Sequence, residues 1–126
     1  MATDPEFLEH ILDIFQGLGR ITTGRMFSGT ALYVEGDVMF ACILGDTVWL
    51  KSDASTLAQF EAAGSRPFTY DRATGAQRVT SLMSLPEAAM DDADEALIWA
   101  RLALGPARKA ADKKRAAKAK KQAKGT

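Results

Sequence analysis

The sequence has a single cysteine and a single histidine, and this scarcity excludes several classes of site. With Cys42 alone, no disulfide can form within the chain, which is typical of a protein from a reducing compartment. Cys42 and His10 cannot supply the four ligands of a tetrahedral zinc site. No run approaches the roughly 18 apolar residues of a membrane-spanning helix, and the acidic start of the chain does not resemble a signal peptide. We therefore expect a cytoplasmic protein without cofactor, metal or membrane association.

Positive and negative charges are distributed unevenly along the chain. Sixteen Lys and Arg balance 16 Asp and Glu overall. Residues 107–126 hold nine basic residues and one acidic residue, a net charge of +8, which leaves −8 for residues 1–106. The same segment is rich in alanine and lacks Leu, Ile, Val and aromatic residues. We therefore divide the chain into a domain over residues 1–106 and a basic tail over residues 107–126, either helical or disordered.

The first half of the domain predicts a helix followed by four short strands. Apolar residues recur at helical spacing between Pro5 and Leu18, after an N-cap at Asp4. Extended stretches at 21–27, 30–34, 38–44 and 47–51 follow, joined by turns too short for parallel pairing. The stretch 38–44 is apolar on both faces. We expect it to be central and covered on both sides, or covered on one side by a partner chain, which also favours a homodimer.

The second half of the domain predicts a mixture of short elements. We expect Ser52 or Asp53 to cap a short helix, then strands at 68–70 and 78–83 around a polar loop at 71–77. A helical region follows from Pro86, and we expect Gly105-Pro106 to end or kink it. Its apolar surface is assigned to Leu97, Ile98, Ala100, Leu102 and Leu104.

Together these elements predict an α+β fold in two layers. An antiparallel sheet of about five to six strands packs against N-terminal, middle and C-terminal helices. Beyond Pro106 we expect no apolar face that docks on this domain, because the large apolar side chains stop there.

Five short segments of the domain occur in a characteristic order and at a characteristic spacing. They are R-M-F-S-G at 25–29, L-Y-V-E-G-D-V-M-F at 32–40, W-L-K-S-D at 49–53, Phe60 and Gly64 followed by P-F-T-Y at 67–70, and L-P-E at 85–87 followed by Trp99 and Ala103-Leu104. Over roughly residues 7–104 they resemble the N-terminal domain of the TfoX/Sxy family of bacterial competence regulators. Ser28 and Trp49 stand where that family has glycine and tyrosine.

This resemblance implies a secretion-chaperone-like fold without catalytic residues. In the namesake regulators this domain helps to switch on DNA-uptake genes together with a cyclic-AMP-responsive activator. The resemblance therefore implies a non-enzymatic regulatory or interaction module, with a protein partner such as a transcription regulator. The namesake regulators carry a second, C-terminal domain where this chain has its basic tail.

One candidate interaction motif lies around residues 25–29. Either its Met and Phe fill the core and its glycine allows a tight turn or bulge, or the motif forms a surface for a ligand or partner, with two cations nearby. The assigned residues are Arg25, Met26, Phe27, Gly29, Tyr33 and Lys51.

The other chemistry-bearing residues of the domain favour structural roles. His10 is expected at the surface beside an apolar helix face, and Cys42 is expected to be a buried thiol. The acidic cluster at 91–95 favours compensation of a helix dipole over a metal site or a catalytic carboxylate pair.

The basic tail is the second candidate interaction site. Lysines bind phosphates through counterion release without reading base sequence, and the tail has no aromatic residue to stack on bases. Either the tail binds nucleic acid non-specifically, which would make the chain a DNA-associated accessory protein, or it is a solvated segment that aids solubility or folds back on the acidic domain. The candidate contacts are Arg108, Lys109, Lys113, Lys114, Arg115, Lys118, Lys120, Lys121 and Lys124.

Overall fold

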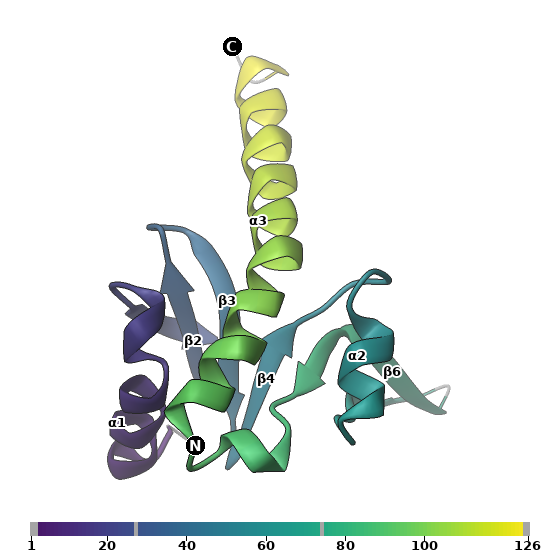
Figure 1. Cartoon of the computed structure of the whole chain (residues 1–126). Helices are drawn as coiled ribbons and strands as arrows, with labels where there is room; N and C mark the ends of the chain where they lie inside the picture. Colours follow the sequence, from purple (N-terminus) through teal and green to yellow (C-terminus); the bar gives the residue numbers. More distant parts are fainter. Residues whose placement is uncertain (1–2, 27, 74, 125–126) are drawn as a thin grey trace.

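The computed structural model describes residues 3–26, 28–73 and 75–124, in which six strands and three α-helices are present (Figure 1). In chain order the elements are α1 (Pro5–Ile14), a 3-10 turn (Gln16–Leu18), β1 (Thr22–Met26), β2 (Gly29–Val34), β3 (Val38–Leu44), β4 (Thr47–Lys51), α2 (Leu57–Ala62), β5 (Pro67–Arg72), β6 (Gly75–Ser84), a second 3-10 turn (Glu87–Ala89) and α3 (Ala93–Lys124).

The six strands form one sheet in the order β1-β2-β3-β4-β6-β5, and every neighbouring pair is antiparallel. The first four strands follow one another because their connections are short turns, such as the one at Gly45, whose φ is 65°. The predicted α+β arrangement with N-terminal, middle and C-terminal helices is confirmed.

The core lies between one face of the sheet and the three helices, which Figure 1 shows on the same side of the strands. Phe15 follows α1 and meets Phe40 of β3 edge to face, with ring centroids 5.4 Å apart. Phe60 of α2 packs against Trp99 of α3 at 5.1 Å. Both ring contacts belong to one apolar cluster that contains residues of all three helices and of the sheet.

The opposite face of β3 is buried within the single chain. Cys42 and Ala31 lie opposite each other on neighbouring strands, and both are at most 1% exposed. Trp49 lies opposite Cys42 on the other side, which places its indole on the same face. Strand β3 is therefore central and buried on both faces, and the homodimer inferred from its apolar sequence stays a prediction.

Three predicted element boundaries are wrong. The first helix ends at Ile14 and is followed by a 3-10 turn over Gln16–Leu18. The polar stretch 71–77 is mostly strand, since β5 continues to Arg72 and β6 begins at Gly75. A polar sequence can still be strand here because β5 is an edge strand, where solvent can cover one side.

The predicted cap of the short helix is also wrong. The N-cap of α2 is Thr56, and Asp53 instead accepts hydrogen bonds from the backbone N–H and the hydroxyl of Ser55. Asp53 thus stabilises the turn that precedes the helix. Aspartate is common both in turns and at helix N-caps, so the sequence alone does not distinguish the two roles.

Gly105-Pro106 does not end the last helix, because α3 continues through Pro106 to Lys124, and the alternative of a kink there stays a prediction. A proline removes one helical hydrogen bond and crowds the residue before it. Gly105 has no Cβ to crowd, and the Ala- and Lys-rich sequence that follows has high helix propensity. The basic tail is therefore helical up to Lys124.

The expectation that the tail has no docking face is also wrong. Buried alanines recur along α3 at a spacing of three or four residues and continue past Pro106, at Ala96, Ala100, Ala103, Ala107 and Ala111. Alanine lets the helix approach the sheet closely, so the contact surface needs no large side chain. Ile98, which the sequence pattern assigns to the apolar face, is 57% exposed.

Candidate functional site

The structure divides the predicted interaction motif between two ends of the sheet. The register places Arg25 opposite Thr30 and Thr30 opposite Ile43. Tyr33 lies near the other end of β2, opposite Met39, and Lys51 is the last residue of β4. Arg25 and Lys51 are therefore not neighbouring cations, and Phe27 lies outside the described residues.

Two residues of this motif have clear structural surroundings. Met26 is half-buried and pairs with Gly29 across the first hairpin. A Cβ built on Gly29 would lie 1.9 Å from the carbonyl oxygen of Ile43. Glycine is required here by the close approach of two backbones, which agrees with the structural interpretation of this position.

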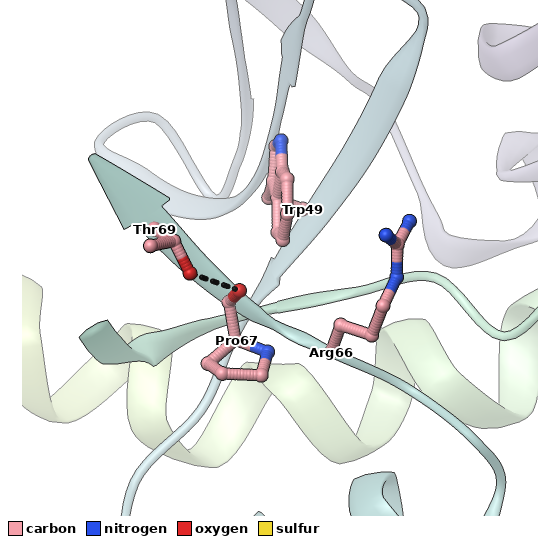
Figure 2. Close-up of a pocket in the computed structure, with 4 residues that line it drawn as sticks. All are labelled: Trp49, Arg66, Pro67 and Thr69. Atoms are coloured by element: carbon pink, nitrogen blue, oxygen red, sulfur yellow. Dashed lines mark hydrogen bonds between the residues drawn. The ribbon is translucent and has the colours of Figure 1, made fainter. Parts of the chain in front are cut away.

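A hollow of about 410 Å³ opens beside β4 and is lined by Trp49, Arg66, Pro67 and Thr69 (Figure 2). The Trp49 indole also meets Phe68 edge to face at 5.2 Å. The start of β5 is fixed because the Arg66 N–H donates to Ser84 Oγ and the Ser84 N–H donates to the Arg66 carbonyl. Within the described part of the chain, the Arg66 guanidinium has no carboxylate partner.

A smaller hollow of about 110 Å³ lies under α3, where β2 ends, β3 begins and β4 ends. The sequence assigns Tyr33 and Lys51 to one candidate motif and Lys114 to the tail, without a link between the two, and the structure brings all three residues together here. The lining is Tyr33, Asp37, Met39, Lys51, Ala107, Ala110, Ala111 and Lys114. The link was missed because it depends on α3 crossing the sheet as one continuous helix.

Two arginines of the basic tail bind carboxylates of the turn between β2 and β3. Arg108 donates two hydrogen bonds to Glu35, one of them 3.0 Å long. Arg115 donates to both carboxylate oxygens of Asp37 at 2.6 and 2.7 Å and also to Asp112. Paired hydrogen bonds of this kind fix the orientation of a guanidinium. This part of the tail folds back on the acidic domain.

These hydrogen bonds lower the pKa of Glu35 and Asp37, because the arginines stabilise the charged carboxylates. The pKa of Arg108 and of Arg115 is raised in return. Since the folded state lowers the carboxylate pKa, the contribution to stability is present at neutral pH and is lost as the pH falls through the lowered values. Both pairs are exposed, so this contribution is small.

The remaining candidate cations of the tail are mostly free. Lys109 lies 3.9 Å from Asp53, which is a loose pair. Within the described residues, five exposed lysines have no carboxylate within ion-pair distance, namely Lys113, Lys114, Lys118, Lys120 and Lys121. Lys124 is the last residue of α3.

His10 and the acidic cluster have structural partners. His10 Nε2 lies 2.7 Å from the carbonyl oxygen of Met90, to which it donates a hydrogen bond, and 3.5 Å from Asp91. Asp92 Oδ1 accepts the backbone N–H groups of Asp94 and Glu95, so it caps the start of α3.

Burial makes Cys42 unreactive in the folded protein. Its side chain is fully buried, and desolvation raises the pKa of the thiol to about 11, although Lys51 acts in the opposite direction. We expect native protein at pH 8 to react with a thiol reagent about a hundredfold more slowly than unfolded protein. Measuring the reaction rate with and without denaturant checks this, and equal rates would contradict the buried position.

Within the described residues, no helix is long and apolar enough to cross a membrane. A comparison with curated proteins finds no match. A family model described as the TfoX N-terminal domain matches residues 13–107, which cover all six strands of the sheet, α2 and the first part of α3. That family is associated with competence regulation. The chain belongs to the TfoX N-terminal domain family.

Proposed function

We propose that this chain is a non-enzymatic, cytoplasmic regulatory adaptor in transcriptional or competence control. Its domain engages a protein partner, such as a transcription regulator, and its basic tail holds the nucleic-acid backbone without reading base sequence. Membership of the TfoX N-terminal domain family supports the regulatory role.

The observation that carries the nucleic-acid part is the continuity of α3. The helix begins in the core and extends beyond the sheet (Figure 1), so the basic tail is attached to the domain without a flexible linker. Lys114, Lys118 and Lys121 continue the spacing of the buried alanines, whereas Lys113 and Lys120 lie on another side of the helix. Cations on several sides suit attraction to phosphates that does not depend on base sequence.

We expect replacement of four lysines by glutamine, K113Q/K118Q/K120Q/K121Q, to weaken binding to labelled duplex DNA strongly. The slope of log affinity against log salt concentration should fall by about one unit for each phosphate that the tail no longer neutralises. Titration at several salt concentrations measures both effects. Glutamine preserves helix propensity, and these side chains are exposed, so the fold should be unchanged.

A matched pair of variants tests whether a loss of DNA affinity depends on where the cations lie or only on the total charge of the protein. K118Q/K121Q and R20Q/R101Q each remove two exposed cations, from the tail and from the domain respectively. Only K118Q/K121Q should weaken DNA binding. Equal losses in both variants, or an unchanged affinity in the four-lysine variant, would contradict a nucleic-acid role for the tail.

The hollow beside Trp49 supports the protein-partner part of the proposal. It combines the Trp49 and Phe68 rings with the Arg66 guanidinium, which has no carboxylate partner among the described residues. This suits a partner segment that carries an apolar side chain next to a carboxylate. Sedimentation equilibrium of the wild type and of R66E tests whether a second copy of the chain occupies this hollow. A dimer that dissociates in R66E would make the partner a second copy of the chain, and a monomer would leave the face to a different protein.

A further inference from the structure

The hollow under α3 combines features that the proposed tail function does not use. Its sheet side is formed by Tyr33, Met39 and Lys51, and its helix side by three alanines and Lys114. The volume of about 110 Å³ is several times what one water molecule needs.

Two ammonium groups at this hollow lack a counter-ion. Neither Lys51 nor Lys114 has a carboxylate within ion-pair distance in the described part of the chain. Lys51 is half-buried, and burial lowers its pKa, with the nearby charge of Lys114 acting in the same direction and Cys42 in the opposite one. A half-buried cation without an acceptor loses part of its hydration, and a bound anion would offset that loss.

The one carboxylate in the lining is already engaged. Asp37 accepts two hydrogen bonds from Arg115, and Lys114 lies close enough to contribute to its lowered pKa. Asp37 is thus paired with a guanidinium, which leaves the two lysine charges of the hollow for another partner. The Tyr33 hydroxyl makes no hydrogen bond to any described residue and can serve as a further donor.

We propose that this hollow binds a phosphate group, carried by a small phosphorylated ligand or by a nucleic-acid backbone. A phosphate monoester carries about −1.5 to −2 charges at neutral pH, which two lysines balance. A backbone phosphodiester carries one negative charge on two free oxygens, which the two lysines can share. Lysine is a common phosphate ligand. The binding residues differ from the four exposed lysines of the tail experiment, so the two proposals can fail separately.

The test is a titration with inorganic phosphate at constant ionic strength, followed by backbone amide chemical shifts. We expect saturable shifts at Tyr33, Lys51 and Lys114. K51Q should weaken phosphate binding about tenfold or more, and K114Q should weaken it as well. K113Q is the matched control, because it removes a neighbouring tail charge that does not line the hollow. The affinity of K113Q for inorganic phosphate should stay within about twofold of wild type.

A duplex without terminal phosphates identifies the source of the group. If the duplex shifts the same amides and K51Q weakens its binding, the hollow holds a backbone phosphate. If inorganic phosphate alone shifts them, the natural ligand is a small phosphorylated molecule. Failure of both probes to shift these amides, or an equal loss of phosphate binding in K113Q and K51Q, would overturn the proposal.

Discussion

Gly29→Ala should destabilise the domain by about 3 kcal/mol, a large fraction of the stability of a small domain. The added Cβ would lie 1.9 Å from the Ile43 carbonyl oxygen and 2.8 Å from Leu44 Cδ2. The leucine can rotate, but the carbonyl belongs to the hydrogen-bonded backbone of a central strand. Relief therefore requires β2 to move away from β3. Denaturant unfolding followed by circular dichroism measures the change.

Gly24→Ala is the matched control for this substitution. Its Cβ would meet only the Tyr33 ring, at 3.1 Å, and a side chain can shift by that amount. We expect a change of less than about 1 kcal/mol. If Gly29→Ala were no more destabilising than Gly24→Ala, the close approach of β2 and β3 would be incorrect.

Phe15→Ala should destabilise the protein by about 3–5 kcal/mol. Phe15 is fully buried and joins the segment after α1 to β3 through its edge-to-face packing with Phe40. Truncation to alanine removes this ring pair and leaves a cavity that the surrounding helices and sheet cannot fill without moving. The melting temperature and the free energy of unfolding should both fall.

Phe15→Leu separates loss of volume from loss of the ring. Leucine keeps most of the apolar volume, so we expect a loss of about 1–2 kcal/mol. Equal losses in the leucine and alanine variants would show that the ring pair, and not the cavity, dominates. An alanine variant as stable as the wild type would contradict the position of Phe15 in the core.

The sequence contains enough information to predict the sheet but not the last helix. Strands β2, β3 and β4 consist of β-formers between short turns, so local pattern and tertiary structure agree. In α3, Gly105 and Pro106 indicate a helix end, while buried alanines on either side favour continuation. Alanine occurs on both buried and exposed helix faces, so the sequence pattern does not predict which alanines are buried. The structure shows their burial because it places the sheet against them.

The sheet side of the hollow under α3 could be predicted from the sequence, but its helix side could not. Tyr33 and Lys51 belong to short segments of the family pattern, but the hollow exists only because Ala107 and Ala111 hold the tail against the domain. The pairs Arg108–Glu35 and Arg115–Asp37 join residues 73 and 78 positions apart. No local pattern of charges predicts which of the nine basic residues of the tail pair with Glu35 and Asp37.

The placement of these two pairs has a mechanical consequence. Both lie beyond Pro106, on the stretch of α3 where Ala107 and Ala111 are buried against the domain. The alanine contacts are apolar, so salt does not screen them, whereas the two ion pairs are exposed and salt weakens them. The first turns of the tail are therefore held more firmly at low ionic strength, and at high ionic strength the alanine contacts alone keep them on the domain.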